Sequence, residues 1–237
     1  ALAYEPDVAV RFVKPGEPIG TPDLVVLPGS KNTIADLTYL YEQGYADEIK
    51  ALSASGVPVL GVCGGNQMLG TVIYDPEHME GDVDEMKGLG LLPTATTMKG
   101  TKTTHQVEFD AKELMFLGEP YSGTGLRGYE IHMGDTVPTG EATRCFNIKT
   151  RSEQPVDVID GFITTDGNVM GTYIHGILDN DGLRRHIING LRKRKGLELL
   201  PEVFHYFEHK NASYDRLADI VEKHLDMDYI DRIVGLK

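Results

Sequence analysis

The chain has 237 residues, 41% of them hydrophobic, which suffices for a sizeable core in one large domain or two small ones. Its 36 acidic and 23 basic residues give a formal net charge of −13, which argues against nucleic-acid binding because phosphates repel such a surface. The sequence has no apolar run of the length of a membrane helix and no signal-peptide pattern at its start. Two cysteines cannot form a disulfide framework, so we expect a reducing, cytoplasmic setting.

The first part of the chain predicts strands that alternate with helices. Residues 8–13 indicate a short strand, and the apolar run 23–30 predicts a buried strand that ends at Pro-Gly-Ser. Helical spacing follows, with a break near Gly44. A second buried strand is expected over 57–63, directly before a helix over 65–73. Because parallel strands need a crossover connection, this order predicts a parallel α/β sheet.

The second part predicts further strands and then helices. Short strands are expected at 105–109, 127–135 and 144–150. The stretch 160–180 predicts two strands joined by a hairpin turn at "TDGN". An amphipathic helix with a basic face is expected over 182–196, and one or two helices over 213–236. The last helices carry apolar residues at core spacing, namely Leu217, Ile220, Val221, Leu225 and Ile230. With no linker or repeat, we expect one domain over 1–237.

The stretch "GVCGGNQMLG", Gly61 to Gly70, has the form of a nucleophile elbow, in which a strand ends at a tight turn that opens a helix. Such a turn requires small residues around Cys63. It would place the thiol at a helix N-terminus, where amides and the helix dipole favour a thiolate. A candidate base is His175, which follows a predicted strand and could lie at the same sheet edge. The alternative is a small buried cysteine, the role that we expect for Cys145.

Several stretches resemble one family. "GVCGGNQMLG" resembles the nucleophile segment of the triad-type glutamine amidotransferases, G-x-C-x-G-x-Q. Four further stretches are similar to the amidotransferase domain of the cobyric acid synthase family: "LPGSKNTIADL" (27–37), "GYEIHMG" (128–134), "GTYIHGILDN" (171–180) and "YDRLADIVEKHLDMD" (214–228). The resemblance covers nearly the whole chain.

The resemblance implies a flavodoxin-like, parallel-sheet fold of the class I glutamine amidotransferases, with the first strand missing. It implies roles for five residues: Cys63 as nucleophile, His175 as base, Gly29 and Gly64 as oxyanion-hole amides, and Gln67 as a residue that holds glutamine. Four more could line the site, namely Ser30, Lys31, Glu130 and His132. The broad family has a glutamate two residues after the histidine, where this chain has Ile177, so the orienting acid is absent or elsewhere; Glu130 and Asp179 are candidates.

The resemblance also implies a function. Glutamine hydrolysis would supply ammonia to an ATP-activated carboxylate on a corrin ring, held by an N-terminal synthetase domain that this chain lacks. ATP and magnesium belong to that domain, since the sequence has no G-x-x-x-x-G-K-[ST] loop, and we expect no cofactor or metal here. The expected partners are glutamine, the synthetase domain and, through it, a corrinoid. Two alternatives stay open: amidation of a peptidoglycan lipid precursor with a ligase partner, or a non-catalytic docking domain.

Overall fold

A computed structural model of the chain describes residues 1–202 and 204–236. In chain order its elements are η1 (Leu2–Tyr4), β1 (Val25–Leu27), α1 (Thr33–Glu42), α2 (Tyr45–Ala54), β2 (Val59–Val62), α3 (Gly64–Leu69), β3 (Val72–Tyr74), β4 (Glu85–Lys87), β5 (Thr94–Leu114), η2 (Phe116–Gly118), β6 (Tyr121–Pro138), β7 (Thr143–Arg151), β8 (Gln154–Ile163), β9 (Val169–Thr172), β10 (Ile174–His175), η3 (Ile177–Asp179), α4 (Asp181–Arg194), α5 (Tyr206–His224) and α6 (Met227–Val234).

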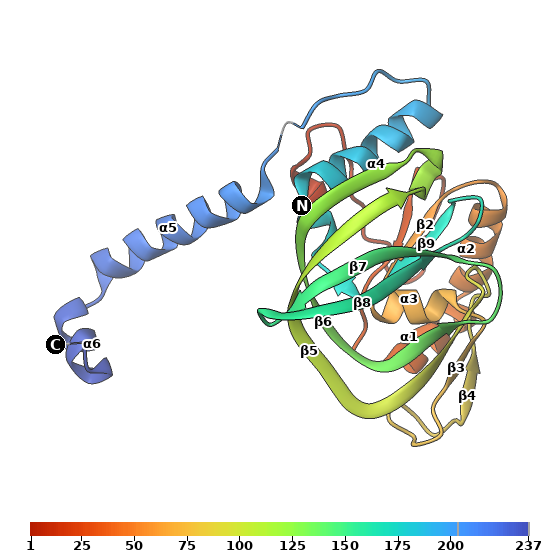
Figure 1. The fold of residues 1–237 in the computed structure, drawn as a ribbon, viewed down its shortest axis with the longest axis horizontal. Helices are drawn as coiled ribbons and strands as arrows, with labels where there is room; N and C mark the ends of the chain where they lie inside the picture. The colour runs from red at the N-terminus through yellow and green to blue at the C-terminus, as the bar shows by residue number, and fades with distance from the viewer. Residues whose placement is uncertain (203, 237) are drawn as a thin grey trace.

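The strands form one curled, ten-stranded sheet in the order β1-β2-β9-β8-β7-β5-β3-β4, and β6 pairs with both β5 and β10 (Figure 1). The predicted parallel part is present, because β1, β2 and β9 run parallel to one another. The predicted hairpin is present as well, since β8 and β9 pair antiparallel. The rest of the sheet is mixed, with antiparallel pairs from β8 through β7 to β5. The strand β1 lies at one end of this order and β4 at the other, and the expectation of a missing first strand stays a prediction.

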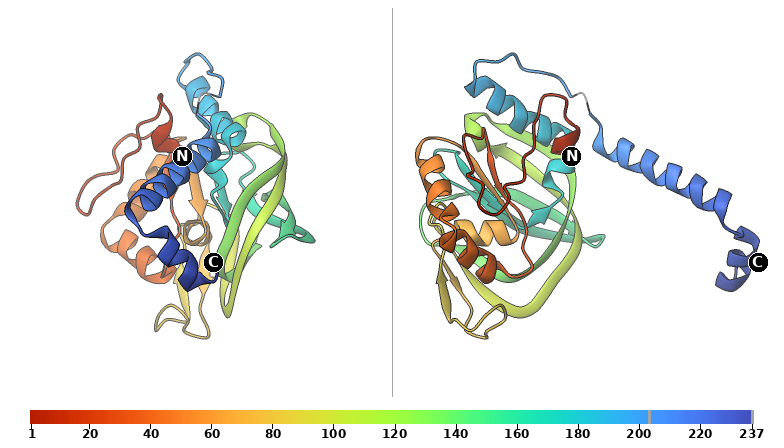
Figure 2. Two further views of the ribbon diagram at one scale, coloured as in Figure 1. Left: turned by 90° about the vertical axis from the view of Figure 1, so that its left-hand side faces the viewer. Right: turned by 180° about the vertical axis from the view of Figure 1, so that it is seen from behind.

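Two strands are much longer than the sequence predicts. The strands β5 and β6 have 21 and 18 residues and form an antiparallel arch with a register shift between Thr97 and Lys102. The segment 99–104 of β5 is polar and mainly exposed, so it lacks the apolar alternation that marks a half-buried strand. Figure 2 shows this arch on one side of the body and helices α1 and α2 on the other, with α3 between them.

A capping side chain and a glycine set the ends of helices α1 and α2. The side chain of Asn32 caps α1 by accepting a hydrogen bond from the amide of Ala35 (2.8 Å). The break at Gly44 is confirmed, because this residue adopts a left-handed φ of 79° between α1 and α2. Two clusters of buried apolar residues form the core, one around Leu37 and Val59 and the other around Phe109 and Phe146.

The N-terminal part of the chain differs from its prediction. Residues 8–13 form no strand and are largely exposed; the side chain of Phe12 is 84% exposed. The preceding segment is instead fixed by charge, because Glu5 accepts a hydrogen bond from Arg184 Nε (2.6 Å) and also pairs with Arg185. The predicted basic face of α4 is therefore wrong at its first turns, since Arg184 and Arg185 are buried in these ion pairs.

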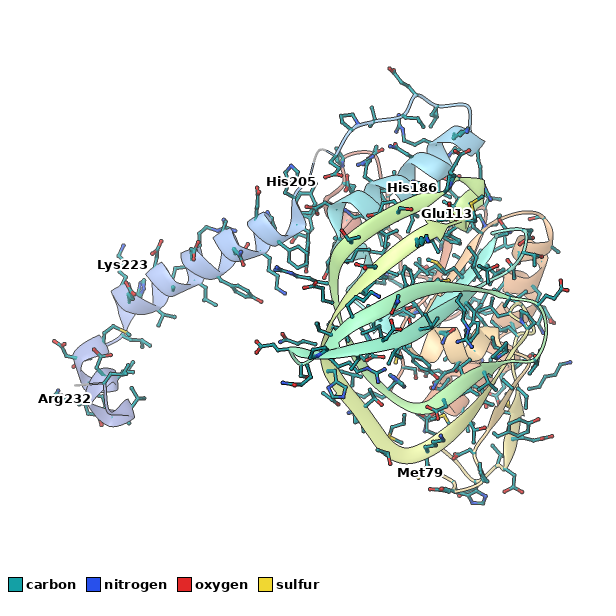
Figure 3. The ribbon with its side chains drawn as sticks, viewed as in Figure 1. Met79, Glu113, His186, His205, Lys223 and Arg232 are labelled. Carbon is teal, nitrogen blue, oxygen red and sulfur yellow. The ribbon has the colours of Figure 1, made fainter. Side chains whose placement is uncertain are left out.

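The C-terminal helices are present, but they do not join the core. Figure 1 shows α5 projecting from the body and α6 turning back at its far end, and Figure 3 shows Lys223 and Arg232 far from the body. No residue of either helix is buried. The prediction of helices over 213–236 is confirmed and that of core packing is wrong, because periodicity reports an apolar face and not what covers it. We call residues 206–236 the arm.

Candidate active site

The strand β2 delivers Cys63 to a strained turn at the carboxyl edge of the parallel strands. Its φ of 53° and ψ of −112° lie where non-glycine residues are rarely found. The amide of Cys63 donates to the carbonyl of Thr172 on β9 (2.8 Å). A Cβ atom on Gly65 would lie 2.0 Å from the carbonyl oxygen of Leu27, so only glycine fits there. The predicted elbow is therefore present in the fold.

The imidazole of His175 lies at the same edge. This residue ends β10, which pairs with β6 opposite Tyr129, and the two rings stack with centroids 4.9 Å apart. A Cβ atom on Gly29 would lie 2.9 Å from His175 Cε1 and 3.6 Å from Cys63 Cβ. The backbone of Gly29 thus adjoins both side chains, and the fold brings these three predicted residues together.

Burial sets the protonation of this pair. It raises the pKa of the Cys63 thiol, while the amide of Gly64 and the charge of Lys102 act in the opposite direction with less effect. The expected low thiol pKa is therefore wrong for this state: α3 has only six residues, and its N-terminus does not offset the loss of water. Burial also lowers the pKa of His175. Both groups are consequently neutral at neutral pH.

The carbonyl of Ile131 on β6 holds the resting thiol. Cys63 Sγ donates to this oxygen at 3.3 Å, and the same carbonyl raises the pKa of His175 against the larger effect of burial. Nε2 of His175 is buried and has no hydrogen-bond partner among residues 1–202 and 204–236. The sequence does not predict this contact, because a pattern of side chains does not reveal which backbone oxygen meets a thiol.

The two candidates in "GYEIHMG" form a cluster beside the thiol. Glu130 is buried and accepts two hydrogen bonds from Arg151 (2.7 and 2.9 Å), and its Oε1 lies 3.7 Å from His132 Nε2. Burial raises the pKa of Glu130, but the nearby His132 and the hydrogen bonds and charge of Arg151 outweigh it and lower the pKa overall. His132 stacks on Tyr173 with centroids 3.8 Å apart. Glu130 is thus held by partners other than His175.

Gln67 links three elements around the site. Its side-chain oxygen accepts from Thr33 Oγ1 at the start of α1 (2.9 Å). Its nitrogen donates to the carbonyl of Met133 on β6 (2.8 Å) and to the hydroxyl of Tyr173 (3.2 Å). Because its polar atoms are engaged and only 3% of the residue is exposed, Gln67 fixes β6 against the elbow. A direct contact with glutamine stays a prediction.

The loop after β1 carries the other candidates. The hydroxyl of Ser30 accepts from the amide of Asn32 (3.0 Å) and donates to Asp36, so it shapes the turn. Lys31 is exposed. The carboxylate of Glu80 accepts from the amide of Thr33 (2.6 Å) at the start of α1 and raises the thiol pKa. The sequence does not indicate that Glu80 lies near the thiol, because its region shows little periodicity.

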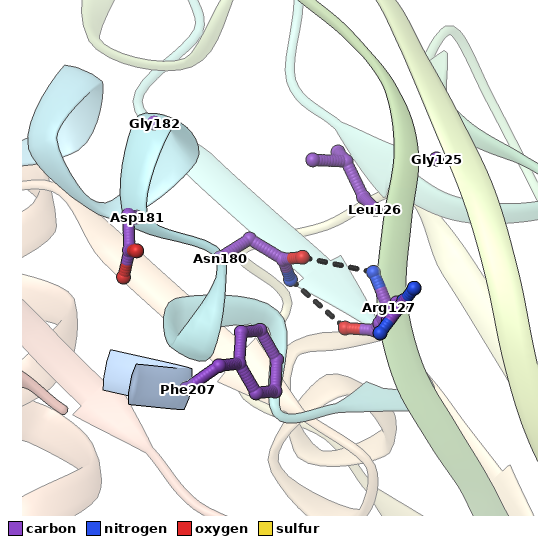
Figure 4. A pocket seen from close by; sticks show the side chains of 7 residues that line it. All are labelled: Gly125, Leu126, Arg127, Asn180, Asp181, Gly182 and Phe207. Carbon is purple, nitrogen blue, oxygen red and sulfur yellow. Dashed lines mark hydrogen bonds between the residues drawn. The ribbon is translucent and has the colours of Figure 1, made fainter. Parts of the chain in front are cut away.

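An open hollow of about 310 Å³ lies elsewhere, between β6, the start of α4 and the arm. Figure 4 shows its centre, where the side chain of Asn180 accepts from the amide of Arg127 (2.8 Å) and donates to its carbonyl (2.9 Å). Neither Cys63 nor His175 lines it.

The described part of the chain contains no cluster of three or more His, Cys, Asp or Glu side chains that could hold a metal ion. No helix in the described ranges has the length and apolar character needed to cross a membrane.

Comparisons with known proteins agree with this geometry. Residues 1–183 match the family described as CobB/CobQ-like glutamine amidotransferase domain. The chain is 44% identical to a cobyric acid synthase of Moorella thermoacetica and 42% identical to one of Streptococcus sanguinis, over 100% and 99% of its length. It spans only 46% and 45% of those two proteins.

A solved structure titled PurLQS from Thermotoga maritima supports the fold. It is 17% identical, with a TM-score of 0.53, and the match covers 74% of this chain and 83% of that one. The expected class I glutamine amidotransferase fold is confirmed, and so is the resemblance to the cobyric acid synthase family. The chain belongs to the CobB/CobQ-like glutamine amidotransferase domain family.

Proposed function

We propose that this chain hydrolyses glutamine at Cys63 and supplies the ammonia to a synthetase part of a cobyric acid synthase. The observation that carries the proposal is the convergence of a strained cysteine, a neutral histidine and a glycine backbone at one sheet edge. A cysteine held in a sparsely populated conformation at a strand–helix turn is the arrangement that enzymes use for nucleophiles.

The chemistry follows from the neutral state of the pair. The Cys63 thiol leaves the carbonyl of Ile131 and passes its proton to His175 as the sulfur attacks the side-chain carbon of glutamine. The protonated imidazole then gives that proton to the leaving nitrogen, so ammonia departs and a glutamyl thioester forms. Water, deprotonated by His175, cleaves the thioester to glutamate and restores the thiol.

Two groups near the thiol suit the charges of this reaction. The amide of Gly64 interacts with the Cys63 sulfur, which supports a role for it, together with the backbone beside Gly29, in stabilising the oxyanion. Lys102, on β5, is a cation whose charge reaches the thiol, so it can attract the carboxylate of a bound glutamine. Gln67 and the Glu130 cluster hold β6 in place around them.

The wider reaction rests on the relatives. Because the chain spans less than half of cobyric acid synthases that it matches at 42–44% identity, an ATP- and magnesium-dependent synthetase part would carry out the amidation of a corrinoid carboxylate. The names of these relatives support a corrinoid acceptor over a peptidoglycan lipid precursor. The site geometry supports an active hydrolase over a purely docking domain.

The test is ammonia release from glutamine. We expect weak release by the chain alone, because no carboxylate among the described residues bonds His175 to orient it, and faster release when a synthetase part, ATP and corrinoid are added. Cys63→Ser should abolish release, whereas Cys145→Ser, at the other buried cysteine, should retain it. Release that survives Cys63→Ser would contradict the proposed nucleophile, and full-rate release by the lone chain would contradict the coupling.

A further inference from the structure

The chain changes its neighbours between β9 and β10. Up to Thr172 the strand β9 runs beside β2 and β8, and from Ile174 onward β10 pairs with β6 instead. Only Tyr173 lies between the two strands. Because His175 is the second residue of β10, the course of the chain through this bend decides where the imidazole lies.

A buried carboxylate holds the bend. Asp160 on β8 is 7% exposed, and both of its oxygens accept from the amide of Tyr173, at 3.2 Å each. Asp160 also accepts a hydrogen bond from the hydroxyl of Thr172, and that hydroxyl accepts from the amide of Ile174 (3.0 Å). Two successive amides of the bend are therefore bound to one acid, directly or through Thr172.

The sheet brings Asp160 to the level of the bend. The ladder between β8 and β9 pairs Phe162 with Gly171, so Asp160, two residues earlier, lies level with residue 173. The intervening Gly161 has a φ of 76°, and a Cβ atom on it would lie 2.9 Å from the carbonyl oxygen of Gly171, so this close approach requires glycine. Burial raises the pKa of Asp160 to about 6, so at neutral pH the group is mainly ionised and both oxygens can accept hydrogen bonds.

The bend connects the two proposed reacting groups. On one side of it, the carbonyl of Thr172 accepts from the amide of Cys63 (2.8 Å). On the other side, His175 directly follows Ile174, and its ring stacks on that of Tyr129. The hydrogen bonds of the buried acid therefore fix the backbone that holds the cysteine and the backbone that carries the histidine.

The other acids near His175 have different partners. Glu130 accepts hydrogen bonds from Arg151, and Asp179 in η3 has the N-terminus and Lys210 as neighbouring cations. No carboxylate among the described residues bonds His175. In this fold an acid can therefore fix the base only through the backbone.

We propose that Asp160 is the acid that positions His175, and that it acts through the backbone of residues 172–174 without touching the imidazole. The inference rests on the proposed function, in which His175 is the base. Because the anchor is a buried side chain bonded to backbone, the imidazole keeps its place while its Nε2, which has no partner in the described part of the chain, stays available to take up a proton.

The experiment measures the position of His175 directly and then through turnover. The ring of Tyr129, with its centroid 4.9 Å from that of the imidazole, should shift the nuclear magnetic resonance of the His175 Cε1 proton to high field, and His175→Gln identifies that signal by its loss. Asp160→Ala should move this resonance toward that of an unstacked histidine. It should also lower kcat for glutamine hydrolysis by about 100-fold and change KM far less, because a misplacement of about 1 Å can cost that much in rate.

A matched control lies at the other end of β9. There the hydroxyl of Thr164 donates to Asp166 (2.5 Å) and accepts from the amide of Val169 (3.0 Å), so the same chemistry holds the hairpin turn away from the site. Asp166→Ala and Thr164→Val should leave the His175 resonance and kcat unchanged. Thr172→Val should act like Asp160→Ala, whereas Thr172→Ser, which keeps the hydroxyl, should retain most of both.

The outcomes separate a positioning role from a merely structural one. Urea unfolding shows which variants are folded, and if Asp160→Ala does not fold, the two Thr172 variants carry the test. An unchanged His175 resonance in the folded variants of the bend, or equal shifts in the variants of the hairpin turn, would overturn the proposal. If the wild type releases no ammonia, the proposed function fails, and the resonance still decides whether Asp160 positions His175.

Discussion

The sheet edge that carries the candidate active site differs sharply from the arm in how its side chains are held. At the edge, Cys63, Gly65 and His175 are fixed by backbone contacts as short as a 2.8 Å hydrogen bond, and a single methyl group would not fit at Gly65. Along the arm no side chain of α5 or α6 is buried. The edge therefore holds the side chains of Cys63 and His175 in position by itself, as the proposed reaction needs, whereas the body leaves the side chains of the arm largely to solvent.

The largest effect should come from the base. His175→Ala should lower glutamine-dependent ammonia release by about 10²–10⁴-fold, because the buried thiol, with its raised pKa, then has no acceptor for its proton. His186→Ala is the matched control, since burial likewise lowers the pKa of that half-buried histidine, which contacts the carbonyl of Glu119 away from the thiol. Equal losses in the two variants would show that histidine removal acts through the fold.

The second effect concerns stability at the elbow. Gly65→Ala should lower the free energy of unfolding by about 3 kcal/mol, because the new Cβ would lie 2.0 Å from a backbone oxygen that cannot move away cheaply. Gly81→Ala is the control, since its Cβ would have only one neighbour, at 3.7 Å. Urea unfolding measures both, and a Gly65 variant as stable as the Gly81 variant would contradict the described turn.

These contrasts explain which parts of the molecule the sequence could predict. Local sequence patterns predict the features that depend on residues close together in the chain. These are the elbow, the break at Gly44 and the hairpin from β8 to β9. The location of Cys63 and His175 on either side of Gly29 could be expected from a shared sheet edge and from the family resemblance. The ion pair of Arg184 with Glu5 joins residues far apart in the chain. A basic pattern on α4 does not predict which acidic residue its arginines contact.

Two further misses have physical causes. A helix N-terminus predicts a low pKa for the Cys63 thiol, but burial has the larger effect and raises this pKa, and local sequence does not reveal burial. The apolar spacing of Leu217 and Val221 predicts core positions, but both side chains are exposed, because the same spacing suits an apolar face on the surface. In both cases the missing information was the solvent exposure of the group.

The two cysteines test the edge more finely. Limiting iodoacetamide at neutral pH should label Cys63 at least about tenfold faster than Cys145, because burial raises the pKa of Cys145 well above its usual value and that of Cys63 less so. Mass spectrometry of the digest gives the ratio. Since both thiols are largely buried, equal rates would mean that labelling reports unfolding of the body and not access at the elbow.

A buried acid of the body gives a smaller, pH-dependent effect. Burial raises the pKa of Asp160 to about 6 from 3.8, so the folded protein holds a proton that the unfolded chain has lost. The resulting stability is full below pH 3.8 and is lost as the pH rises through about 6. Relative to Asp160→Asn, the wild type should lose about 1.4 kcal/mol of unfolding free energy between pH 5 and pH 8. The exposed Asp219→Asn on the arm should show no such dependence, and a parallel response would refute a buried origin.

The smallest effect should come from the arm itself. Deleting residues 213–237 removes exposed or half-buried side chains of α5 and α6, so the unfolding free energy of the body should change by no more than about 0.5 kcal/mol. Deleting residues 196–237 should cost more, because it also removes the carbonyl of Phe204 and the amide of Tyr206, which bond Arg184 and Asp181. Arg184 would then lose a hydrogen-bond acceptor and its contact with the Phe204 ring, and leaving such a donor without its partner costs about 1–3 kcal/mol. Urea unfolding of both truncated chains measures the difference. If the shorter deletion destabilises the body as much as the longer one, the arm packs on the body in solution, and the contrast between edge and arm fails.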